Sequence, residues 1–151
     1  MFRGIVAAAA AACVITAGAA SAELAKWDQA RVTKYAAELT GATGDLKQAL
    51  EGIGIQNAAN QNSWYQVRDT VQMLDTAAQS LAAGLKAGKG HDETLPRFKR
   101  LQQLRRDAEL EGQSADIPEA VFEKVFSVGS ALIKLRPYYE DQPMEEEKKA
   151  Q

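Results

Sequence analysis

The only histidine of this 151-residue chain, His91, lies in the stretch KAGKGHDETLP (residues 86–96) and is followed directly by Asp92 and Glu93. An imidazole beside carboxylates is a combination that binds metal ions in many proteins. The competing interpretation is a polar residue in a linker, because two glycines precede it and the next helical pattern begins near Thr94. We favour the linker interpretation and keep His91 as a metal ligand only in an alternative function.

The rest of the chain offers little for catalysis. Its single cysteine, Cys13, lies near the N-terminus, and neither a glycine-rich phosphate loop nor a nucleophile elbow is present. No pair of carboxylates or lysines has a spacing that predicts acid–base catalysis. One histidine also excludes a di-iron site, which needs Glu-x-x-His on two helices. We therefore predict a protein that is not an enzyme and that has no cofactor.

A second candidate site lies in the first helical pattern. Its members are Trp27, Asp28, Arg31 and Tyr35. Charged residues fall within the apolar stripe there, which is costly unless they are paired or hydrated. One interpretation is a polar ligand pocket in which Arg31 holds an anion and Asp28 orients it. The other is an ion pair between these two residues on a shallow rim.

The segment RFKRLQQLRRD, from Arg97 to Asp107, is rich in basic residues. Its charges point around the whole circumference of a helix, whereas a nucleic-acid surface gathers them in one stripe. We therefore expect no nucleic-acid partner. A solvated helix face is the interpretation that we favour, and contact with an anionic envelope surface is the alternative.

The clearest helix is predicted over Asn62–Ala87. Its apolar residues are spaced by three and four alternately, as in a heptad seam that faces a core. They are Trp64, Val67, Val71, Leu74, Ala78, Leu81 and Leu85.

The opposite face of this helix also lacks charge. Its residues form a second seam of small side chains and one methionine, namely Met73, Ala77, Ser80, Gly84 and Ala87. Small residues allow another helix to approach closely. Either the predicted short helix over Asp45–Glu51 or the loop after it covers this face, or another chain does, as in a homo-oligomer or a complex with an envelope protein.

The other helices are predicted from similar periodicities. A helix over Leu24–Leu39 ends at two glycines and is followed by a short helix over Asp45–Glu51. Two further helices are predicted over Thr94–Leu110 and from Asp116 to Arg136. The last of them should be the most buried, with Asp116 and Glu119 as a capping box. These elements predict an all-α fold, an antiparallel up-down four-helix bundle with one short extra helix.

The two ends of the chain are distinct from this domain. Residues 1–22 combine a basic start, an alanine-rich apolar run and Ala20-Ser21-Ala22, which is typical of a signal peptide cleaved before Glu23. The alternatives are a retained anchor and acylation at Cys13. Residues 23–139 form the helical domain, and residues 140–151 form a charged tail that we expect to be disordered. The leader predicts a periplasmic or secreted protein without a transmembrane anchor after cleavage.

In size, helix number and compartment the chain resembles exported haem bundles of the cytochrome b562 kind, which use a methionine and a histidine as ligands. The ligands do not match, because His91 precedes a helix and Met73 points away from the predicted core. The sequence therefore favours a non-catalytic binding protein that recognises proteins or itself. A haem- or metal-carrying bundle with non-standard ligands is the alternative.

Overall fold

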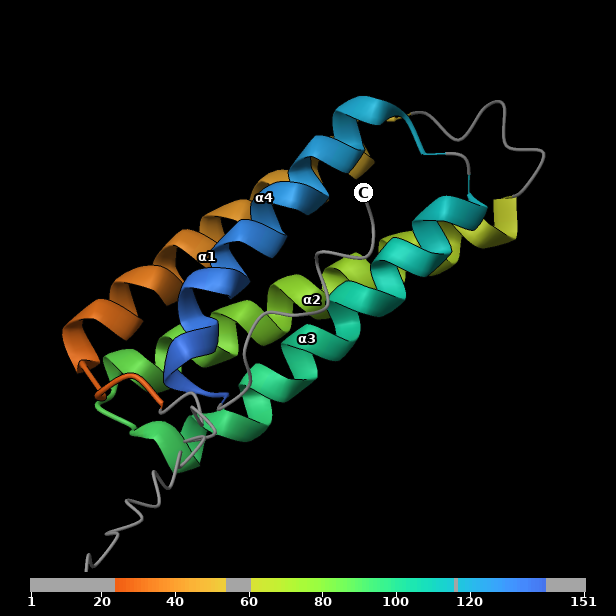
Figure 1. Cartoon of the computed structure of the whole chain (residues 1–151). Helices are drawn as coiled ribbons and strands as arrows, with labels where there is room; N and C mark the ends of the chain where they lie inside the picture. Colours follow the sequence, from red (N-terminus) through yellow and green to blue (C-terminus); the bar gives the residue numbers. More distant parts are fainter. Residues whose placement is uncertain (1–23, 54–60, 116, 141–151) are drawn as a thin grey trace, which may run out of the picture.

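A computed structural model of the chain describes residues 24–53, 61–115 and 117–140. The described residues contain four α-helices and no strand. These are α1 (Gln29–Glu51), α2 (Gln61–Lys86), α3 (His91–Ser114) and α4 (Glu119–Leu135), followed by the 3₁₀ helix η2 (Arg136–Tyr138) (Figure 1). The predicted all-α class with four long helices is confirmed.

The four helices share one core. Helix α1 packs along both α2 and α4, and α2 also packs along α3, whereas α3 and α4 meet less extensively (Figure 1). Every helix contributes buried apolar residues to a single cluster. The largest fully buried side chain is Phe98 of α3.

The heptad seam of α2 faces this core, as predicted. All seven of its residues are buried, from Trp64 at the start to Leu85 near the end. Burying each of the larger side chains contributes roughly 1.5–3 kcal/mol relative to leaving it exposed. The seam is therefore the main reason that α2 is held in place.

The prediction of a break in the first helix is wrong. Helix α1 runs continuously through Gly41 and Gly44 to Glu51, so there is no separate short helix. Its buried residues keep the helical spacing across both glycines, namely Val32, Ala36, Leu39, Thr43, Leu46 and Leu50. A glycine costs about 1 kcal/mol relative to alanine inside a helix, and this continuous buried stripe offsets that cost.

The beginning of α1 also differs from the prediction. Residues 24–28 are not helical, and the Asp28 carboxylate caps α1 by accepting a hydrogen bond from the backbone N–H of Arg31 at 3.0 Å. The backbone N–H of Ala25 donates to the Pro137 carbonyl at 2.7 Å. The segment before α1 is therefore fixed against η2.

Helix α4 is less buried than predicted. Phe126 is 73% exposed, and Phe122 and Val125 are only partly buried. The helix begins at Glu119 with Pro118 at the capping position, where no side chain caps it. The predicted partner in the capping box, Asp116, lies outside the described residues, as do the predicted signal peptide and residues 141–151 of the predicted tail.

Candidate functional site

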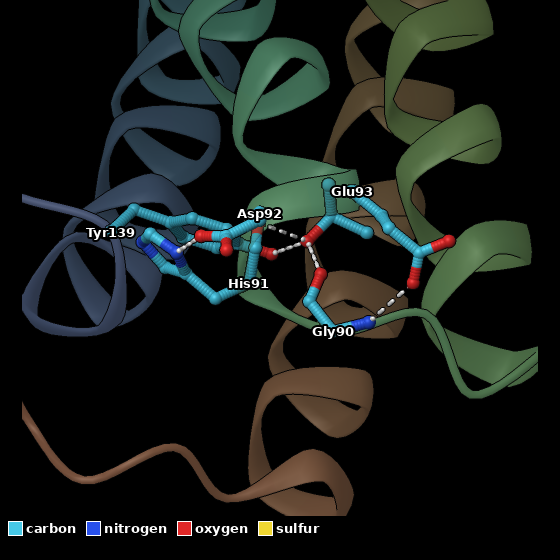
Figure 2. A network of polar contacts seen from close by, with 6 residues as sticks. Gly90, His91, Asp92, Glu93 and Tyr139 are labelled. Carbon is cyan, nitrogen blue, oxygen red and sulfur yellow. Dashed lines mark hydrogen bonds and ion pairs between the residues drawn. The ribbon is translucent and has the colours of Figure 1, made fainter.

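His91 is not in a linker, because it is the first residue of α3. Figure 2 shows it within a network of polar contacts at this helix start. The Nδ1 atom of His91 lies 2.7 Å from the Asp92 carboxylate, and the N–H of Gly90 donates to Glu93 at 3.2 Å. The Gly90 carbonyl accepts a hydrogen bond from the Thr94 hydroxyl at 2.7 Å. Two carboxylates in the first turn of a helix are favourable, because that end of the helix dipole is positive.

The imidazole of His91 belongs to an aromatic group that we name the tryptophan cluster, defined as Trp27, His91, Phe98 and Tyr139. The His91 ring stacks on Tyr139 at 5.6 Å between ring centres and meets the edge of Trp27 at 5.8 Å. Tyr139 also stacks on Phe98 at 4.4 Å. The cluster joins the segment before α1, the first two turns of α3 and the end of η2.

Hydrogen bonds tie the tryptophan cluster to the neighbouring helices. The Trp27 indole donates to Gln29 at 2.8 Å, and the Gln29 amide donates to the Leu85 carbonyl at 2.7 Å. The hydroxyls of Tyr139 and Thr94 form a buried hydrogen bond of 2.8 Å. Burial raises the pKa of Tyr139, and the hydrogen bond with Thr94 partly opposes that rise.

The cluster does not have the donors of a metal site. The Nε2 atom of His91 is buried and has no hydrogen-bond partner among the described residues. Because the Asp92 carboxylate faces Nδ1, we assign the proton to Nδ1 and the lone pair to Nε2. Across residues 24–53, 61–115 and 117–140, no group of three or more His, Cys, Asp or Glu is arranged to hold a metal ion. The surroundings of His91 are those of a packing residue.

The structure divides the four residues of the predicted ligand pocket, because Trp27 packs elsewhere while Asp28, Arg31 and Tyr35 stay near one another. Trp27 belongs to the tryptophan cluster, whereas Tyr35 lies against Tyr138 at 6.4 Å between ring centres. Arg31 is 60% exposed, and its Nε atom lies 3.7 Å from the Asp28 carboxylate. The nearby Tyr138 side chain is the first cause of the raised pKa of Arg31, and the Asp28 carboxylate contributes to it. The ion-pair interpretation of Asp28 and Arg31 therefore matches the geometry.

A second ion pair links α1 to α4 beside Tyr35. The Lys134 ammonium lies 2.7 Å from the Glu38 carboxylate and 5.9 Å from the centre of the Tyr35 ring. The hydrogen bond between them lowers the pKa of Glu38 and raises that of Lys134. The charges of Glu38 and Lys134 thus compensate each other.

A hollow of about 440 Å³ opens on the outer side of α2 and α3. We name it the α2–α3 hollow, and its lining residues are Asp69, Gln72, Met73, Thr76, Ala77, Ser80, Arg100 and Leu104. Three members of the predicted second seam line it. Met73 is 39% exposed. The hollow combines an apolar middle with a polar rim.

The remaining two members of the second seam do not line the hollow. Gly84 is buried, and a Cβ atom placed on it would lie 3.1 Å from the guanidinium of Arg97. The chain's own α3 therefore covers this position. Ala87 follows the end of α2 and is exposed.

The basic residues of α3 have separate environments. Arg97 lies on Gly84 and Arg100 lines the α2–α3 hollow, whereas Arg105 pairs with Glu109 at 2.8 Å. Arg105 also lies over Gly129 of α4, where a Cβ atom would be 3.8 Å from the guanidinium. A single basic stripe is absent from the described part of α3.

Sequence reasoning missed a buried polar contact between α1 and α2. The Asp75 carboxylate is buried and accepts hydrogen bonds from the Thr43 hydroxyl at 2.8 Å and the Gln79 amide at 2.9 Å. The sequence does contain an indication of this contact, because Asp75 directly follows Leu74 and so lies beside the heptad seam. This contact fixes the position of α1 along α2, because a shift of either helix would leave a buried carboxylate without its donors.

Comparisons with known proteins gave no relative: no protein-family model, curated protein or solved structure matches the chain. None of the helices in the described part of the chain combines the length and hydrophobicity needed to cross a bilayer. Function must therefore be argued from the site geometry alone.

Proposed function

We propose that this protein is exported and acts, without catalysis, as a binding protein for other protein chains. In this proposal residues 1–22 direct export, and the helices are connected as an antiparallel up-down bundle that serves as a rigid support. The recognition surface is the α2–α3 hollow. The tryptophan cluster holds the bundle together at one end.

The exposure of Met73 within the hollow is the observation that carries the proposal. Methionine is enriched at interfaces, because its flexible and polarisable side chain adapts to a partner surface. Beside it, Ala77 and Ser80 are small enough for a partner to reach the backbone of α2. Arg100, of another residue type enriched at interfaces, lies on the rim.

A haem- or metal-carrying bundle is less well supported by the geometry. Met73 lines the hollow on the outer side of α2, and His91 lies in the tryptophan cluster. His91 follows the end of α2 at Lys86, and the part of α2 from Met73 to Lys86 spans about 20 Å along the helix axis. These two side chains do not converge on one position, so they do not form the pair of ligands that a haem iron needs.

Site-specific photocrosslinking in the producing cells tests the recognition surface. A photoreactive amino acid at position 73 should give an adduct of discrete mass, because the partner covers the hollow. The same amino acid at position 37, an exposed alanine on α1, is the matched control. The adduct should disappear when Ala77→Glu is added. The absence of an adduct at position 73, or equal adducts at both positions, would contradict the proposal.

The intact mass of the purified protein tests export. We expect a chain that begins at Glu23, because cleavage would follow Ala20-Ser21-Ala22. A mass that still includes residues 1–22, measured on protein from the membrane fraction, would instead indicate a retained anchor.

A further inference from the structure

The α2–α3 hollow carries opposite charges that have no partner within the described chain. Asp69 and Arg100 both line the hollow, and neither takes part in an ion pair or side-chain hydrogen bond with another described residue. The neighbouring cations of α3 do not line the hollow, since Arg97 lies on Gly84 and Arg105 pairs with Glu109. The hollow therefore presents one free anion and one free cation to whatever binds there.

The two charges lie at opposite ends of the hollow. Arg97 lies on Gly84, so Arg100, one turn further along α3, is level with Ser80 of α2, which lines the same hollow. Asp69 precedes Ser80 by three turns, or about 16 Å along the axis. Met73 and Ala77 lie between the charges, on either side of the midpoint.

This order of charge, apolar middle and opposite charge is self-complementary. In an interface with twofold symmetry, residue i of one copy meets residue j of the other, and j meets i. An axis at the midpoint would bring Asp69 of each copy to Arg100 of the other and Met73 to Ala77. The same pairing would cover the exposed methionine and compensate both free charges.

We propose that the occupant of the α2–α3 hollow is a second copy of this chain, in a symmetric dimer with two reciprocal Asp69–Arg100 ion pairs. This inference rests on the proposed function and names the partner. Each copy supplies the partners for both free charges of the other copy's hollow. Because the pairs lie on the rim of an open hollow, raised salt concentration should weaken the dimer.

Charge reversal tests the pairing by sedimentation equilibrium of the folded protein over the micromolar range. Asp69→Arg and Arg100→Asp should each weaken self-association about tenfold or more, because each places like charges opposite one another twice. The combined variant Asp69→Arg/Arg100→Asp should restore the dimer. Asp45→Arg and Lys99→Asp make the same charge changes on exposed residues outside the hollow and should leave the dimer unchanged.

Mixing the two single variants gives the sharpest result. The Asp69→Arg chain and the Arg100→Asp chain should form a mixed dimer, since both contacts then join opposite charges. Circular dichroism should show that all variants keep the wild-type helix content. A mixture that stays monomeric, or single variants that still dimerise, would overturn the reciprocal pairing.

The outcome also separates this inference from the proposed function. The wild-type chain could be monomeric at all concentrations and still crosslink from position 73 to a different protein. That result would contradict the symmetric dimer and support the proposed binding function. A monomeric chain with no crosslink from position 73 would overturn both. A crosslinked species of twice the chain mass would support both.

Discussion

The tryptophan cluster and the α2–α3 hollow differ in how their polar groups are compensated. In the cluster, the indole of Trp27 and the hydroxyl of Tyr139 have partners within the chain, and only the Nε2 atom of His91 has none among the described residues. In the hollow, Asp69 and Arg100 have no ion-pair or side-chain hydrogen-bond partner among the described residues, and Met73 is exposed. The first arrangement stabilises the monomer, and the second leaves interactions for another molecule. In our proposal, Trp27 and His91 therefore serve the fold, and the α2–α3 hollow serves binding.

The largest effect should come from removing the most buried ring of the cluster, Phe98. Phe98→Ala leaves a cavity beneath Tyr139 in the most buried part of α3, and we expect the free energy of unfolding to fall by about 3–5 kcal/mol. Met73→Ala, in the hollow, should cost about 1 kcal/mol or less, because Met73 is already partly exposed. Urea denaturation of both variants measures this difference. Equal losses would mean that the hollow is as much a part of the core as the cluster is.

The hydroxyl of Tyr139 should have a smaller effect, which depends on pH. Because the pKa of Tyr139 is raised in the folded state, its stabilising contribution is complete below the unfolded pKa, near 10. That contribution is lost as the pH rises through the folded value. Tyr139→Phe should cost about 1 kcal/mol at neutral pH through the lost Thr94 hydrogen bond. It should also reduce the loss of stability in alkaline solution, as measured by urea denaturation at a series of pH values. A variant with the same alkaline loss as the wild type would show that Tyr139 ionises freely in the folded state.

His91→Phe separates a packing role from a ligand role. A phenyl ring keeps the stacking on Tyr139 and removes the unpartnered Nε2 atom, so we expect the free energy of unfolding to change by less than about 1 kcal/mol. His91→Ala should cost more, because it removes the ring from its contacts with Trp27 and Tyr139. Thermal unfolding of the two variants gives the comparison. A large loss of stability in His91→Phe, seen only when metal or haem is added, would instead favour the haem- or metal-carrying bundle.

The smallest effect is expected at the pair formed by Glu38 and Lys134. This pair is exposed, so Glu38→Gln should leave the melting temperature nearly unchanged at moderate salt. The lowered pKa of Glu38 means that its contribution is present above the unfolded pKa and disappears as the pH falls through the folded value. Any difference between wild type and variant should therefore vanish in acid. A difference that grows in acid would show that Glu38 acts through another contact.

Periodicity was sufficient to predict the class of the fold and most of the core. The spacing of Trp64 to Leu85 specified both the length and the buried face of α2, because an amphipathic helix has one dominant solution. The same argument failed at Gly41 and Gly44, where local propensity indicated a break and the buried stripe from Leu39 to Leu46 overrode it. It failed again at Phe126, since an apolar residue in a helix need not face the core.

Contacts between distant segments were beyond this kind of reasoning. The second seam was recognised on α2, but only the structure shows that Arg97 covers Gly84 and that Arg100 lies on the rim of the hollow. Trp27, His91 and Tyr139 lie far apart in sequence and are brought together by the packing of three segments. No local pattern around His91 indicates that Tyr139 stacks on it. That Asp69 and Arg100 line one hollow could not be predicted for the same reason, because they lie on different helices.

The hydrogen bond between Ala25 and Pro137 has a consequence for how the domain is attached. It holds the two borders of the helical domain side by side, next to the tryptophan cluster. A tether on either side, whether a retained leader or a fused protein, would therefore pull on the same end of the molecule. The long sides of α2 and α3 would stay free of the attachment point. A fusion at either border should leave the α2–α3 hollow accessible, so an immobilised domain could still meet a second copy in solution.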